Sequence, residues 1–127
     1  MTDEVFFGIN RAIEWLVFNH EVSSSGNVID GVTASRTLPA YASHLEAAKL
    51  VIEHFEKGGA TITFTEAGNA WECQFAPSPD DVGWRSTTTT DRSKPLALCL
   101  CVLKSARDIL TEADKMPAGV AALLEVK

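Results

Sequence analysis

Apolar residues in the first twenty positions recur at the spacing of an amphipathic helix. One stripe of that helix consists of Val5, Ile9, Ala12, Ile13 and Leu16. Thr2 or Asp3 can cap the helix at its start, and we expect it to end near Asn19. The stripe is predicted to face the protein core.

Larger side chains gather on the opposite side of the same predicted helix. Phe7 and Phe18 are eleven residues apart, so at about 100° per residue they point the same way. Arg11, Glu14 and Trp15 accompany them. The exposed face of a helix is normally polar, so the two aromatic side chains need a cover. Two covers remain open: the following segment folds back over them, or these five residues form a subunit or partner interface.

The pattern is lost between residues 20 and 38, where serines are frequent. We predict a loop there, in which residues 28–32 can form an edge strand. A loop of this length in a small domain is either functional or mobile. Composition does not decide between these two alternatives.

A second helix is predicted to begin with a capping box formed by Ser43 and Glu46 and to end at Gly58 and Gly59. Its expected buried face consists of Leu45, Ala48, Val51, Ile52 and Phe55. Apolar and polar residues then alternate over residues 61–65 and 71–75, which predicts a hairpin.

A third strand is expected over residues 82–90, with Trp84, Ser86 and Thr88 on one face. The last long helix should follow Asp91 or Ser93 as its cap and continue to about residue 110. Its apolar residues surround the whole circumference, which indicates burial on most sides. Beyond its end, residues 116–119 form a break, and residues 120–126 can form a short terminal helix.

These elements predict an α+β fold in which helices sandwich a three-stranded antiparallel sheet. Their order is helix, helix, three strands and helix, plus a short C-terminal helix. The two later long helices should pack on one face of the sheet, and the first helix should cover the other. The expected core contains Leu45, Ile52, Phe64, Trp71, Phe75, Leu96, Leu100 and Leu103.

The chain has 127 residues, of which 46% are apolar, so we predict a single domain over residues 1–127. Residues 39–110 are its best-defined core, and residues 111–127 form a tail or short helix. The net charge is −6, which disfavours nucleic acid as a partner. We see neither a signal peptide pattern nor an apolar run long enough for a membrane span, so we expect a cytoplasmic protein without a membrane partner.

The residue types that carry chemistry show no catalytic, metal or cofactor motif. Cys73, Cys99 and Cys101 are an odd number in apolar surroundings without CxxC spacing, which is typical of free buried thiols. The three histidines lack the spacing of a metal site. The best acid–base pairs, His44 with Glu46 and Asp91 with Arg92, are ones that ordinary surfaces contain by chance. We therefore predict no enzyme, no cofactor and no metal.

Several segments together resemble the phage ABA sandwich domain family. They are a Tyr in Pro39-Ala40-Tyr41, the Ala47-Ala48 pair, Trp71 in the hairpin, and Thr90-Asp91 followed by residues 95–103. The resemblance covers about half the chain and departs from the family pattern at Leu98 and Cys101, where the family commonly carries Ile and Ala. It implies a phage or prophage protein acting in a bacterial host cell, and it carries no catalytic residues over.

A protein that binds a host or phage protein is our first functional interpretation. It fits the acidic surface and the candidate residues Phe7, Arg11, Glu14, Trp15 and Phe18. The target could be a host defence complex such as CRISPR, and the same residues could instead form a homodimer contact. The alternatives are a small enzyme or ligand-binding protein and, third, a nucleic-acid-binding module.

Overall fold

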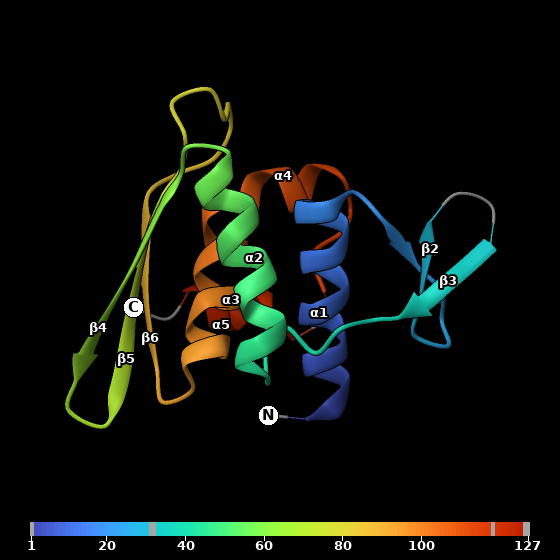
Figure 1. The fold of residues 1–127 in the computed structure, drawn as a ribbon, viewed down its shortest axis with the longest axis horizontal. Coiled ribbons are helices and arrows are strands. Elements are labelled where there is room, and N and C mark those ends of the chain that lie inside the picture. The colour runs from blue at the N-terminus through green and yellow to red at the C-terminus, as the bar shows by residue number, and fades with distance from the viewer. Residues whose placement is uncertain (1, 31–32, 118, 126–127) are drawn as a thin grey trace.

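The structure is a computed structural model that describes residues 2–30, 33–117 and 119–125. Within these residues, five helices and two small sheets follow one another (Figure 1). The elements are α1 (Asp3–Phe18), β1 (Glu21–Val22), β2 (Asn27–Asp30), β3 (Thr33–Thr37), α2 (Leu45–Lys57), β4 (Thr61–Ala67), β5 (Ala70–Ala76), β6 (Thr87–Asp91), α3 (Lys94–Ser105), α4 (Arg107–Glu112) and α5 (Ala121–Glu125).

The predicted α+β fold with a three-stranded antiparallel sheet is confirmed. Strands β4, β5 and β6 form that sheet in sequence order, with Ile62 opposite Phe75 and Cys73 opposite Thr89. Helix α3 packs against β5 and β6, and α2 packs against α3 and β4. The alternation of strand residues thus supplies one apolar face, which the two helices cover.

Helix α1 does not lie where we predicted it. It packs on α3, on the side away from the sheet, and the other face of the sheet is left uncovered by helices (Figure 1). The reason lies in α3, in which every residue from 96 to 103 is buried, so this helix needs neighbours on two sides. The outer face of the sheet instead carries exposed polar residues such as Thr63, Gln74 and Thr88, which need no cover.

Two of the predicted helix caps are present at the helix starts, and one is not. Thr2 caps α1, and the Ser93 side chain caps α3 by accepting a hydrogen bond from the Leu96 N–H at 3.3 Å. The capping box predicted from Ser43 and Glu46 is wrong, because α2 begins after His44 without a side-chain cap. There the N–H groups of Ser43 and His44 both donate to the Ala40 carbonyl, and the resulting turn shifts the start of the helix.

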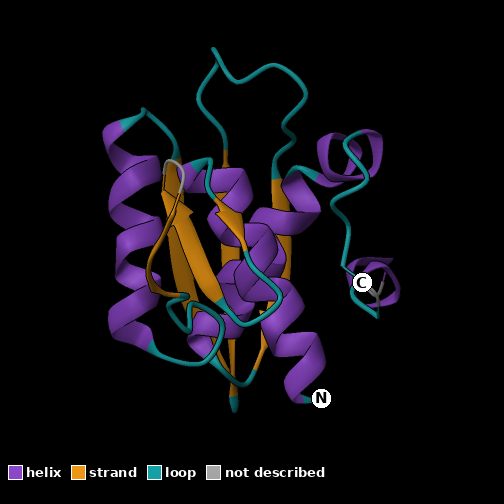
Figure 2. Cartoon of the chain, turned by 90° about the vertical axis from the view of Figure 1, so that its right-hand side faces the viewer, coloured by secondary structure: helices purple, strands orange, loops and turns teal. Residues whose placement is uncertain are grey.

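Residues 20–38 are not the loop that we predicted. Strands β1, β2 and β3 form a second antiparallel sheet beside α1, and the Leu38 N–H donates to the Gly26 carbonyl at 2.9 Å. In Figure 2, which views the molecule from the right-hand side of Figure 1, this small sheet is nearest the viewer. The edge strand predicted over residues 28–32 corresponds to β2 as far as Asp30, and residues 31–32 lie outside the described residues.

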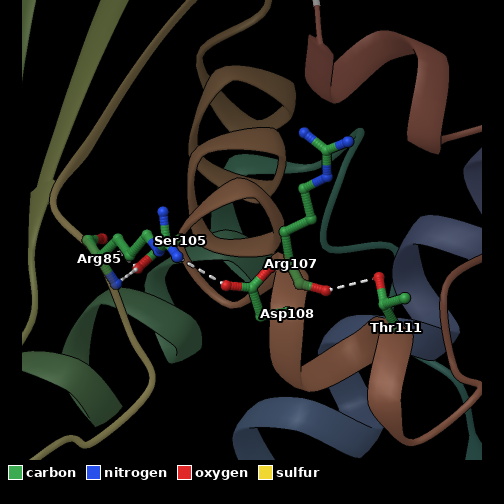
Figure 3. A network of polar contacts seen from close by, with 5 residues as sticks. All are labelled: Arg85, Ser105, Arg107, Asp108 and Thr111. Atoms are coloured by element: carbon green, nitrogen blue, oxygen red, sulfur yellow. Dashed lines mark hydrogen bonds and ion pairs between the residues drawn. The ribbon is translucent and has the colours of Figure 1, made fainter.

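The third strand of the main sheet is shorter than predicted, because Arg85 bonds to the end of α3 instead of to β5. Its backbone N–H donates to Ser105 Oγ at 3.2 Å, and the Ser105 hydroxyl donates back to the Arg85 carbonyl. The Arg85 guanidinium also pairs with Asp108 at 2.9 Å (Figure 3). Trp84 consequently lies outside the strand, where its ring packs against Phe75.

The predicted core is largely confirmed. Phe75, Leu96, Leu100 and Leu103 are buried. Phe64 and Trp71 of the sheet and Ile52 of α2 are half-buried. Leu45 is the exception: it is 40% exposed at the start of α2. The predicted helix to residue 110 is interrupted at Ala106, where α3 ends and α4 follows.

Candidate functional site

The face of α1 that carries the candidate partner-binding residues is divided into two parts by the structure. Phe18 lies in the covered part. Its ring stacks on Tyr41 with centroids 5.8 Å apart and meets His54 of α2 at 5.4 Å. The segment that follows the small sheet therefore folds back over this end of α1, which was one of the two covers that the sequence left open.

Glu14 lies in the same covered part and is fully buried. One carboxylate oxygen accepts a hydrogen bond from the Tyr41 hydroxyl at 2.6 Å, and the other lies 2.7 Å from His20 Nδ1. A carboxylate that is closed off in this way has no surface to offer a partner. The prediction that Glu14 belongs to a partner-binding patch is therefore wrong.

Hydrogen bonds from α1 hold the returning segment in place. Asn10 accepts from the Ala42 backbone N–H at 2.9 Å, and Glu14 accepts from Tyr41 one residue earlier. Both side chains point from α1 toward residues 41–42, which are themselves buried. This part of α1 therefore has a structural role, since it ties the start of α2 to the first helix.

Sequence reasoning missed this network because its members lie far apart in the chain. Helix phase nevertheless contained a signal: Glu14 falls between Phe7 and Phe18 on the same face of α1. If the following segment covers the aromatic residues, it must also bury this carboxylate, which then requires polar partners. Tyr41 and His20 are polar residues that the covering segments can supply.

The other part of the α1 face lines an open groove. Phe7, Arg11 and Trp15 form one wall, and β1 and residues 114–117 form the others. Its volume is about 280 Å³. Phe7 and Trp15 are half-buried and Arg11 is exposed, so three of the five predicted residues remain together at a surface. We call this site the α1 groove.

Two contacts fix the far wall of the α1 groove. Pro117 packs so closely on α1 that a Cβ atom added at Gly8 would lie 2.9 Å from the Pro117 Cβ, so the helix needs glycine there. Lys115 Nζ lies 3.1 Å from a Glu21 carboxylate oxygen and 5.7 Å from the centre of the Trp15 ring. These contacts join the segment after α4 to both α1 and β1.

In the part of the chain that the structure describes, the α1 groove has two cationic side chains, of which Lys115 forms an ion pair and Arg11 does not. The Lys115 ammonium is paired with Glu21, and Asp114 also lies in the wall. Among the residues that the structure describes, none forms an ion pair with Arg11. The groove therefore offers aromatic surface beside one exposed guanidinium that can bind a carboxylate in bidentate fashion.

The cysteines are free and buried, as predicted. Hydrogen bonds from Cys73, Thr87 and Thr89 lower the pKa of Cys101 to about 7, whereas burial raises the pKa of Cys99. The hydrogen bond with Cys101 raises the pKa of Cys73. Because solvent does not reach Cys101, its lowered pKa does not make it an accessible nucleophile.

The acid–base pairs weighed from the sequence have ordinary surroundings. His44 and Glu46 are both exposed, and Asp91 accepts a hydrogen bond from the Ser93 N–H at 2.8 Å, which orders the start of α3. Over residues 2–30, 33–117 and 119–125, no three metal-ligating side chains come together. No helix within that part of the chain has the length and apolar character needed to cross a membrane.

Comparison with known proteins gives a similarity of fold. No protein-family model and no curated protein matches the chain. Among solved structures, the chain is similar to a crystal structure of a phage protein from Bacillus cereus ATCC 14579, with a TM-score of 0.60 and 22% sequence identity. The match covers 80% of this chain and 90% of the other. The chain therefore shares most of its fold with a phage protein, and the ABA sandwich family remains a resemblance.

Proposed function

We propose that the chain is a small, non-enzymatic phage-type protein that binds a host or phage protein through the α1 groove. The observation that carries the proposal is that an exposed Arg11 lines the same groove as the half-buried Phe7 and Trp15. Aromatic residues and arginine are the types most enriched at binding hot spots. The partner should supply an apolar side chain to the groove and an Asp or Glu carboxylate to Arg11.

Two further observations support a phage origin and a binding role. A phage protein from Bacillus cereus shares the fold. The net charge of the chain is −6, whereas Arg11 is an exposed cation in the groove. Arg11 can therefore attract an acidic segment of the partner to this one place on an acidic molecule. Our first choice of target class is a host defence complex, such as a CRISPR complex.

Charge reversal at Arg11 tests this proposal. The tagged wild-type chain, an Arg11→Glu variant and an Arg92→Glu variant are used to capture proteins from host and phage lysates. Arg92 is an exposed arginine beside β6, so the control changes the net charge equally at a distant place. We expect a protein captured by wild type and by Arg92→Glu to be lost with Arg11→Glu, at a cost of about 2 kcal/mol or more.

The captured protein is then purified and its affinity for the three forms is measured. Equal affinity for Arg11→Glu and Arg92→Glu would exclude the α1 groove as the binding site. A small molecule that raises the melting temperature, with no protein captured, would favour the alternative of a ligand-binding protein or enzyme. For a CRISPR target, expression of wild type but not of Arg11→Glu should restore phage plaques on an immune host.

A further inference from the structure

We propose that two copies of the chain pair through their β4 edges, so that two three-stranded sheets become one six-stranded sheet. This surface is separate from the α1 groove and does not depend on the proposed function. Figure 1 shows β4 at the edge of the main sheet, away from α1 and the small sheet. The occupant of the edge is a second copy of the same chain.

Strand β4 is an edge of the main sheet without the usual protection. It ends the strand order, spans seven residues, and pairs with β5 in unbroken register from Thr61 to Ala67. Proteins usually protect such edges with charged side chains, above all lysine, with proline or with a β-bulge, because unpaired backbone groups bind other strands. Strand β4 contains no lysine, proline or bulge, and its one charged residue, Glu66, stands next to the last position of the strand.

The opposite edge of the same sheet makes the contrast clear. Lys104 extends from α3 and donates a hydrogen bond from Nζ to the Thr88 carbonyl of β6 at 3.5 Å. A lysine at that edge opposes pairing with another strand. Of the two edges, β4 is therefore the one available for pairing.

A row of incompletely covered apolar side chains lies beside β4. Ile62 and Phe64 face the helices but are only half-buried, and Leu45 is 40% exposed on α2. Leu45 and Ile52 are seven residues apart and share a flank of α2. His54 contacts Phe18 of α1 on the opposite flank, so the flank of Leu45 is turned toward β4. A second copy at this edge would complete the burial of these residues.

The sequence of β4 is also compatible with antiparallel pairing to a copy of itself. A two-fold axis at Thr63 places Ile62 of one copy opposite Phe64 of the other and keeps every side chain on its own face. Thr61 then lies opposite Thr65. Glu66 lies opposite Ala60, before the start of the other strand, so its carboxylate is not set against Ile62 or Phe64. Cross-strand threonine pairs of this kind stabilise antiparallel sheets. Thr63 and Thr65 are exposed in the single chain, so the pairing needs no rearrangement of the core.

The α2 helices of the two copies are also complementary in charge. Lys49 and Glu56 are exposed on the same flank as Leu45, seven residues apart. Lys49 Nζ lies 3.4 Å from Glu46 of its own helix, an exposed pair that leaves the ammonium accessible to a second carboxylate. A two-fold axis across the middle of α2 brings Lys49 of one copy to Glu56 of the other, and the reverse pair forms by symmetry. Like-charged pairs at these positions would have opposed the association.

The mass in solution, measured by light scattering after size exclusion, tests this pairing. We expect wild type at twice the chain mass of 13.7 kDa. Thr63→Lys with Thr65→Lys should halve the mass, because four lysines then meet across the two-fold axis. Thr88→Lys with Thr90→Lys is the matched control on β6 and should leave the dimer intact. Thermal unfolding followed by circular dichroism checks that each variant remains folded.

A charge swap gives a second readout that does not alter the sheet. Lys49→Glu should weaken the dimer, and Lys49→Glu with Glu56→Lys should restore it. A wild-type chain that stays monomeric at high concentration overturns the proposal. So does a dimer that survives the β4 lysines or dissociates with the β6 lysines. Because Arg11→Glu lies outside this interface, it should leave the mass unchanged, which separates failure of this proposal from failure of the proposed function.

Discussion

At the scale of single residues, the buried carboxylate of Glu14 explains how the chain is ordered between α1 and α2. Its oxygens bind the Tyr41 hydroxyl and His20 Nδ1, so two segments that follow α1 are fixed to it. A buried carboxylate without such partners would cost several kcal/mol. The angular position of Glu14 on α1 can be predicted from the helical repeat. The partners of Glu14 cannot be predicted in this way, because they depend on how the chain returns after the small sheet.

Removal of the Tyr41 hydroxyl tests this role. Tyr41→Phe keeps the ring that stacks on Phe18 and removes only the donor to Glu14. We expect the free energy of unfolding to fall by about 1 to 3 kcal/mol, since one hydrogen bond to a buried carboxyl is lost. Urea denaturation of wild type and variant measures the difference. A Glu14→Gln background serves as the control, because the effect of Tyr41→Phe should be smaller there; an equal effect would show that the two side chains do not interact.

At the scale of elements, local signals predicted those parts of the fold that depend on neighbouring residues. The β4–β5 hairpin follows from strict alternation, and the start of α3 follows from Ser93 and Pro95. The position of α1 and the small sheet could not be predicted in this way. The position of α1 depends on which helix needs a second neighbour. The small sheet depends on pairing between polar segments that show little alternation.

The burial of α3 predicts how the cysteines react. The lowered pKa of Cys101 would make it the fastest thiol toward a disulfide reagent if solvent reached it, but all three thiols are enclosed between α3 and its neighbours. We expect no thiol to react promptly in the native protein and all three to react in denaturant. The absorbance of the thiolate that the reagent releases gives the number of cysteines that have reacted.

A Thr88→Cys variant is the control for this measurement. Its added thiol lies on the exposed face of β6, outside the proposed contact between copies, and should react at once in the native state. Prompt reaction of a wild-type cysteine would contradict the packing of α3 between α1 and the sheet.

At the scale of the whole molecule, the layers separate two surfaces. The main sheet with its β4 edge lies at one end of the molecule, and α1 and the small sheet lie toward the other (Figure 1). The α1 groove is lined by α1, β1 and residues 114–117. Of the predicted partner-binding residues, Phe7, Arg11 and Trp15 remain at that groove, whereas Glu14 and Phe18 are covered by segments of the same chain. A protein bound at the groove and a second copy bound at β4 would therefore not compete.

Amide hydrogen exchange, measured on the free chain and on its complex with the captured protein, is the sharpest test of the proposed binding of a protein at the α1 groove. We predict slower exchange on binding in residues 7–15, 21–22 and 114–117, and unchanged exchange in residues 61–67. Slower exchange confined to the main sheet, or no change in any of the three groove segments, would contradict the claim.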